Sequence, residues 1–239
     1  MPGAEIDVAA ELRLFLRPRY RHEPVVVACD GTSTVGHMVQ SLGVPLTEVG
    51  RLAVNGAVVE PRYRPADGDR VRVDAVRRPQ RLAEPRFVLD VHLGTLARRL
   101  RLLGVDSAYS NDAGDEALVE HANARRRVLL TQDRGLLRRR GLWAGGYVRG
   151  ARPDAQLADV LDRFAPPLAP WTRCLACNGL LSPVTKADIE PVLRPGTRRT
   201  YQSFSRCPDC GQVYWRGAHS RRLQAIIDSA CAGSLAPRP

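Results

Sequence analysis

The sequence predicts an α/β fold, a parallel sheet flanked by helices, with a small β-rich domain before it and a cysteine module after it. Three observations predict this order. From residue 86 onwards, apolar segments typical of strands alternate with helical patterns. Before residue 78, valines alternate with polar residues, and after residue 170 two Cys-x-x-Cys pairs occur. A chain of 239 residues is long enough for all three parts.

Arginine dominates the charge of the chain. The 36 basic residues exceed the 25 acidic ones, which gives a formal net charge of +11 and an isoelectric point of about 10.1. Guanidinium groups make planar, two-point contacts with phosphate, so this excess favours a nucleic-acid partner. The open alternative is an arginine-rich proteome of high GC content, in which the bias carries no function.

No leader or membrane segment is expected. The first residues include acids, and no apolar run approaches the roughly 20 residues that span a bilayer. We therefore expect a cytoplasmic protein without a membrane partner. In that reducing compartment, two Cys-x-x-Cys pairs predict metal binding rather than disulfides, and Cys29 and Cys231 are expected to be plain thiols.

Residues 1–78 are predicted to form a small β-rich domain of the β-grasp type. The segments EIDVAAELRLFL and PVVVAC are strand-like. Thr34 can cap a helix that ends at Gly43, and Asn55-Gly56 between apolar segments predicts a hairpin. A last strand, GDRVRVDAV, alternates inward valines with outward charged residues.

This N-terminal segment resembles the ubiquitin-like sulfur carriers of thiamine and molybdopterin synthesis, through VNG and the later DGDRVRV. Those carriers need a free C-terminal Gly-Gly pair, whereas this chain reads VRRPQ at the corresponding position and continues. Sulfur transfer is therefore not expected. We expect an accessory domain that binds or docks a protein partner, with a folded spacer as the alternative.

A basic, proline-containing linker at residues 79–85 leads into an α/β domain at residues 86–166. Strand-like segments alternate there with helical patterns. Apolar residues at helical spacing run from Leu93 to Leu103, and Gly104 follows where a C-terminal glycine belongs. This alternation predicts a parallel sheet covered by helices on both faces.

Four carboxylates lie where elements of this domain are expected to begin or end. Asp90 follows the first strand, Asp115 and Glu116 begin the second helix, and Asp133 follows the third strand. Ligands of open parallel sheets gather at the carboxyl ends of the strands, so these acids can face one edge. Mg²⁺ and Mn²⁺ prefer oxygen ligands and can activate water for phosphodiester cleavage. The set predicts metal-dependent cleavage of a nucleic acid, with Asp90 and Asp133 as metal ligands.

Each acid also has a structural alternative. Asp115 can cap the second helix, Glu116 can favour its positive end, and Asp133 can cap the short helix expected next. Asp90 is the hardest to explain in this way, because it directly follows the apolar segment FVL, and Asp112 is the weakest candidate.

Arginines near these acids are candidates for binding the phosphates of a substrate. They are Arg98, Arg99 and Arg101 on the first helix and Arg134 after Asp133, with further arginines at positions 138–140. A solvated helix face explains some of them equally well.

Residues 167–239 are predicted to form a zinc ribbon followed by a helix. The pairs Cys174/Cys177 and Cys207/Cys210 are each followed closely by glycine, as in zinc knuckles. Four thiolates make a closed, structural Zn²⁺ site, with redox-active dithiols as the alternative.

Aromatic and arginine side chains are mixed in the same module, as in proteins that bind single-stranded RNA by stacking. The aromatic ones are Tyr201, Phe204, Tyr214 and Trp215. The alternative is that Tyr214 and Trp215 cover the metal centre.

Two motifs, FVLDVHLGTLARRLRLLG with a later Asp-Glu pair and RVLLTQDRGLL, resemble the Mut-seven C-terminal RNase family, a branch of the PIN-like nucleases. The resemblance extends over about residues 86–216, and family members often carry an N-terminal ubiquitin-like domain. It implies a PIN-like fold and metal-dependent cleavage of RNA, with Asp90, Asp115 or Glu116, and Asp133 as the acidic residues. A non-catalytic RNA-binding or adaptor protein on the same scaffold is the alternative.

Overall fold

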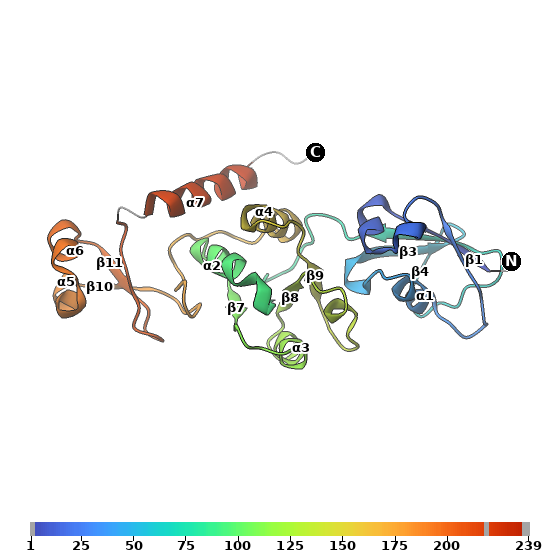
Figure 1. Cartoon of the computed structure of the whole chain (residues 1–239), viewed down its shortest axis with the longest axis horizontal. Helices are drawn as coiled ribbons and strands as arrows, with labels where there is room; N and C mark the ends of the chain where they lie inside the picture. Colours follow the sequence, from blue (N-terminus) through green and yellow to red (C-terminus); the bar gives the residue numbers. More distant parts are fainter. Residues whose placement is uncertain (1–2, 218–219, 236–239) are drawn as a thin grey trace. The chain divides into compact units, whose positions relative to one another are not determined.

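The computed structural model describes residues 3–217 and 220–235 of the chain (Figure 1). Backbone contacts divide the chain into two compact units. The first unit combines residues 1–80 with 115–148, and the second combines residues 81–114 with 149–239. Each unit therefore joins segments that are distant in the sequence.

The first unit begins with a five-stranded sheet of the β-grasp type. β1 and β5 are parallel neighbours, and the other pairs of this sheet are antiparallel. Helix α1, Val35–Ser41, buries its apolar side chains in the core that it shares with the sheet. In their order across the sheet, the strands are β2 Val25–Val27, β1 Ala4–Val8, β5 Arg70–Ala75, β3 Val49–Val54 and β4 Ala57–Val59.

Local sequence signals in this sheet are confirmed. The hydroxyl of Thr34 accepts a hydrogen bond from the His37 N–H at 3.2 Å and caps α1. Asn55 and Gly56 both have positive φ, +49° and +85°, as a tight hairpin turn between β3 and β4 requires. Each of these residues acts through its immediate neighbours.

One expectation for this part is wrong. The segment EIDVAAELRLFL is strand only to Val8 and continues as the 3-10 helix η1, Ala10–Phe15. In a 3-10 helix, residues three apart lie on one side, and Leu12 and Phe15 have this spacing and are both buried. A second short 3-10 helix, η2 Pro18–Tyr20, follows.

Within the first unit, the β-grasp sheet and residues 115–148 are joined by specific contacts. Glu48 ends the 3-10 helix η3, Leu46–Glu48, and is 1% exposed. Its carboxylate accepts a hydrogen bond from the Tyr147 N–H at 2.8 Å. The ring of Tyr147 packs edge-on against Phe15, with ring centroids 5.1 Å apart. A buried acid thus satisfies a backbone donor of strand β9.

Parallel strand pairs form the α/β part of the chain. In the second unit, β6, Phe87–Leu89, pairs in parallel with β7, Ser107–Tyr109. In the first unit, β8, Val128–Thr131, pairs in parallel with β9, Gly145–Tyr147. The predicted fold class, an α/β chain with parallel sheet strands flanked by helices after a β-rich N-terminal part, is confirmed.

Helices pack on these strands within each unit. In the second unit, α2, Gly94–Leu102, contacts β7 and α4, Pro153–Phe164. In the first unit, α3, Asp115–Ala124, contacts β8. Short 3-10 helices, η4 Val91–Leu93 and η5 Leu136–Arg138, follow β6 and β8.

The predicted end of α2 is also confirmed. Leu96, Ala97 and Leu100 are buried along one stripe of the helix. Gly104 has a left-handed φ of +80°, and an added Cβ there would lie 2.1 Å from the carbonyl oxygen of Ala169. Glycine is therefore required both for the turn and for the close approach of the later chain.

The cysteine module of the second unit contains three short antiparallel strands. The long segment between its cysteine pairs is folded. Its elements are β10 Ser182–Val184, α5 Lys186–Ile189, η6 Glu190–Val192, α6 Pro195–Thr200 and β11 Phe204–Arg206. The third strand, β12 Val213–Tyr214, follows the second cysteine pair.

The last helix, α7, Ser220–Leu235, contacts α2 and α4 and buries Ile227 and Ala230. Across residues 3–217 and 220–235, no helix has both the length and the apolar character needed to cross a membrane.

Replacing Glu48 by alanine is expected to destabilise the protein, because the Tyr147 N–H loses its buried acceptor. We expect the free energy of unfolding to fall by about 1–3 kcal/mol, measured by urea denaturation. Glu60→Ala is the control, since Glu60 is an exposed carboxylate that pairs with Arg62 at the surface. It should change stability by less than about 0.5 kcal/mol. Equal losses in the two variants would contradict the role assigned to Glu48.

Candidate functional site

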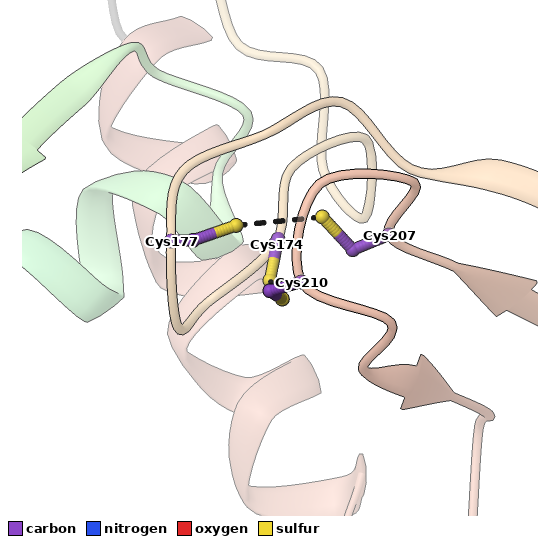
Figure 2. A group of neighbouring side chains, drawn as sticks. All are labelled: Cys174, Cys177, Cys207 and Cys210. Carbon is purple, nitrogen blue, oxygen red and sulfur yellow. Dashed lines mark hydrogen bonds between the residues drawn. The ribbon is translucent and has the colours of Figure 1, made fainter.

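Four cysteines of the second unit, Cys174, Cys177, Cys207 and Cys210, form a compact cluster. Figure 2 shows their side chains converging from two loops, and the four sulfur atoms all lie within 4.8 Å of one another. Two sulfur pairs are 3.4 and 3.6 Å apart. A disulfide needs about 2.05 Å, whereas sulfurs about 2.3 Å from a tetrahedral ion lie roughly 3.8 Å from each other. The cluster has the donor type, number and spacing to hold a metal ion such as zinc.

Two similar turns present these thiols. The Asn178 N–H donates back to the carbonyl of Cys174 at 3.0 Å, and the Gly211 N–H donates to that of Cys207 at 2.9 Å. Asn178 and Gly211 both have a φ of +76°, which asparagine and glycine tolerate best. At Gly179, an added Cβ would lie 2.1 Å from a carboxylate oxygen on the second turn. Glycine therefore allows the two turns to approach each other.

The thiols differ in acidity in the metal-free protein. Burial opposes ionisation of Cys174, but hydrogen bonds from the Tyr214 hydroxyl and from two backbone amides outweigh it and lower the pKa to about 6. Burial and the neighbouring sulfurs raise the pKa of Cys177 to about 12. Near neutral pH the cluster therefore holds a thiolate, which gives a cation an anionic donor to bind first.

A buried guanidinium joins the first cysteine turn to the α/β part of the same unit. Arg101 of α2 is 2% exposed. Its Nε donates to the Ser107 carbonyl at 2.8 Å, and its Nη1 donates to the Leu175 and Ala176 carbonyls at 3.1 and 2.7 Å. Burial lowers the pKa of Arg101, and the nearby cysteine thiolates oppose that shift. Arg101 is thus a counter-charge for the cluster.

This burial does not fit the phosphate-binding role that the sequence predicts for Arg101, because its donors already meet backbone carbonyls inside the protein. Arg99 is also engaged, since its guanidinium pairs with Asp154 of α4 at 2.5 Å. Arg98 is exposed on α2. In the first unit, the guanidinium of Arg134 lies 5.5 Å from the centre of the Phe15 ring.

Asp90 lies at the carboxyl end of β6 and is 7% exposed. Its carbonyl accepts a hydrogen bond from the Leu93 N–H at 2.9 Å, which begins η4. The Tyr109 hydroxyl donates to the Val91 carbonyl at 2.8 Å and lies so close to Gly94 that an added Cβ would be 2.7 Å from it. Asp90 is the only buried residue among the four predicted acids, and it lies at the carboxyl end of a parallel strand, where α/β proteins place ligands.

The other predicted acids, Asp115, Glu116 and Asp133, lie in the first unit and are exposed. One carboxylate oxygen of Asp133 accepts from the Gly135 N–H at 2.6 Å, so Asp133 stabilises the turn after β8. Asp115 pairs with Arg139 at 3.2 Å, and both Asp115 and Glu116 lie in the first turn of α3. The weakest candidate, Asp112, is an exposed acceptor for the Ser110 hydroxyl in the second unit.

The structure therefore brings the four cysteines together within one unit. The four acids are divided between the units, with Asp90 in the second and the other three in the first. That they share a metal ion stays a prediction.

The sequence does not reveal the role of Asn178. Its Oδ1 accepts from the Ser107 N–H at 2.9 Å, and its Nδ2 donates to Asp106 at 2.8 Å. These contacts fasten the first cysteine turn to the beginning of β7. The only local signal is an asparagine directly after Cys177, and its partners lie about 70 positions earlier.

The fold and the cysteine cluster define an α/β protein with a β-grasp N-terminal part and a four-cysteine module. The family model described as Mut7-C RNAse domain matches residues 85–227, and the model described as Mut7-C ubiquitin matches residues 1–81. The chain therefore belongs to the Mut7-C RNAse domain family. No curated protein and no solved structure was found to match it.

The cysteine cluster predicts one bound metal ion per chain, with zinc the ion that its four sulfur donors favour. Cys174→Ser removes a buried donor and should abolish stoichiometric metal content, measured by native mass spectrometry and elemental analysis. Cys231→Ser, which lies outside the cluster, is the matched control and should retain the metal. Loss of the ion from the control, or its full retention in Cys174→Ser, would contradict the assignment.

Arg101→Met keeps most of the side-chain volume but leaves three carbonyls without their donor. We expect it to lower the free energy of unfolding by about 1.5–3 kcal/mol. Arg98→Met on the exposed face of the same helix should change stability by less than about 0.5 kcal/mol. A phosphate-binding role for Arg101 would show the reverse pattern, in which affinity for RNA falls and stability is unchanged.

Proposed function

We propose that this chain is a metal-dependent ribonuclease that hydrolyses RNA phosphodiesters. The observation that carries the proposal is the nearly buried carboxylate of Asp90, which follows a parallel strand in a chain of the Mut7-C RNAse domain family. The carboxyl ends of parallel strands are where α/β proteins place ligands. The strongly basic composition is consistent with a polyanionic substrate.

The proposed catalytic residues are Asp90, Asp115, Glu116 and Asp133. Asp90 and Asp133 are the proposed ligands of Mg²⁺ or Mn²⁺, because these ions prefer carboxylate oxygens. When bound, such an ion lowers the pKa of water and offsets charge on the phosphate. The water oxygen bonds to phosphorus as the bond to the leaving ribose oxygen breaks, and a carboxylate of the set accepts the water proton.

Arginines near the acids are the proposed phosphate contacts. Arg98 is exposed on α2, and Arg134 follows Asp133 directly. Arg99 can contribute only after its ion pair with Asp154 opens. Arg101 has no place in this set, because it is committed to the carbonyls of the cysteine module.

We further propose that the four cysteines hold Zn²⁺ in a closed structural site. Four thiolates fill a tetrahedral shell and leave no position for a reactive water. Metal binding then supplies folding free energy to a small module. Free thiols of this kind persist in a reducing compartment, which supports a cytoplasmic location. The ubiquitin-like part is the proposed docking site for a protein partner.

A non-catalytic RNA-binding or adaptor protein is the second candidate. Two of the four acids have partners of a structural kind: Asp133 accepts from the Gly135 N–H, and Asp115 pairs with Arg139. Acids retained only for stability would make such contacts. Activity of the purified protein separates the two candidates.

Incubation with structured and unstructured RNAs and Mn²⁺ tests the nuclease proposal. Wild-type protein should cleave, and Asp90→Asn and Asp133→Asn should each slow cleavage on the order of 10²-fold or more, because each removes a charged ligand from the site. Asp112→Asn is the control, since Asp112 lies in an exposed loop, and it should cleave normally.

Unchanged cleavage in Asp90→Asn and Asp133→Asn would remove the proposed site. Absence of metal-stimulated cleavage of any RNA by the wild-type protein would favour the non-catalytic candidate.

A further inference from the structure

Aromatic side chains are concentrated in one cleft of the cysteine module. The chain has only three tryptophans, six tyrosines and four phenylalanines. Five of these residues line a cleft of about 670 Å³: Trp171, Tyr201, Phe204, Tyr214 and Trp215. The cleft therefore concentrates aromatic side chains, which are scarce in the rest of the chain.

The walls of this cleft are held in place by the cysteine cluster and by ring contacts. The Tyr214 hydroxyl lies 3.1 Å from the sulfur of Cys174 and accepts a hydrogen bond from the Leu175 N–H at 3.0 Å. The rings of Phe204 and Trp215 have centroids 6.3 Å apart and a tilt of 58°. A ligand can therefore bind without first ordering these side chains, which favours affinity.

A simple cover for the metal centre does not explain this arrangement. Trp215 remains 38% exposed, whereas Phe204 next to it is buried. The guanidinium of Arg216 lies 5.8 Å from the centre of the Trp171 ring, so a cation also lines the cleft. An exposed indole beside an arginine is a combination that binds flat, charged ligands.

The charge of the module indicates which ligand fits. Residues 171–217 contain six arginines and one lysine against three acidic residues. A zinc ion with four thiolates would add a charge of about −2, which still leaves the module positive. Exposed Arg194, Arg199 and Arg206 belong to this excess. The net charge of the module therefore complements a polyanion, and Arg216 places one cation in the lining of the cleft.

We infer that this cleft binds an unpaired nucleobase of single-stranded RNA, stacked on Trp215, with the neighbouring phosphates on the arginines. Bases in a duplex are stacked on each other and cannot enter such a cleft, whereas unpaired bases stack on aromatic rings. The inference rests on the proposed function for the choice of RNA. It adds that the cysteine module, outside the carboxylate site, holds a single-stranded segment of the substrate.

The test uses full-length, zinc-loaded protein with Asp90→Asn, so that binding is measured without cleavage. The probe is a short unstructured RNA with a central 2-aminopurine, whose fluorescence is quenched when the base stacks on an indole. Trp215→Ala should weaken binding about 5- to 150-fold, the range for loss of one stacked base, and should abolish the quench. Trp215→Phe keeps an aromatic ring for stacking and should restore most of the affinity.

Trp143→Ala is the matched control, because Trp143 is similarly exposed, at 41%, and lies beside an arginine but outside the module. It should leave affinity and quench unchanged. The zinc content of Trp215→Ala is measured as well. A value equal to that of the parent protein shows that the metal site is intact. Unchanged binding and quench in Trp215→Ala would overturn the inference.

The outcomes also separate this inference from the proposed function. If the cleft binds no base, cleavage of RNA by the wild-type protein can still depend on Asp90. If the chain is not a nuclease, cleavage is absent while the quench and its loss in Trp215→Ala remain.

Discussion

The second unit depends on how one buried positive charge, the guanidinium of Arg101, is compensated. A charge removed from water is costly unless hydrogen bonds replace its hydration. The carbonyls of Ser107, Leu175 and Ala176 provide that replacement, and the nearby Cys174 thiolate provides negative charge. Because these acceptors come from both the β7 strand and the first cysteine turn, neither segment can shift without leaving the charge uncompensated. The cysteine module is therefore part of the unit's core.

A buried acidic side chain has a similar effect in the first unit. Glu48 accepts from the backbone of Tyr147, and the Tyr147 ring packs on Phe15 of the ubiquitin-like part. Arg134, next to Asp133, also lies over Phe15. The ubiquitin-like part thus contacts the segment that follows β8, which carries one of the proposed catalytic acids. The proposed protein partner of the ubiquitin-like part must therefore dock on a different surface.

Sequence patterns predict the features that depend on neighbouring residues. The Thr34 cap, the Asn55-Gly56 hairpin, Gly104 and each Cys-x-x-Cys pair of the cysteine cluster are of this kind, because each is defined within a few positions. Arg101 could not be predicted in the same way. The leucine pattern shows only that Arg101 lies off the apolar stripe, and α2 is surrounded on several sides by β7, α4 and the cysteine turn. Two of its three carbonyl partners, those of Leu175 and Ala176, lie more than 70 positions later.

The cysteine cluster and the aromatic cleft are mechanically coupled through Tyr214. Its hydroxyl contacts the sulfur of Cys174 and the backbone of Leu175, and the next residue in the chain is Trp215. Burial raises the pKa of Tyr214, so its hydroxyl stays protonated and can donate to a thiolate at physiological pH. An ion that fixes the position of Cys174 would therefore also fix Tyr214, the residue next to Trp215. In the proposed binding mode, a closed metal site, which has no open position for substrate, would influence RNA binding without touching RNA.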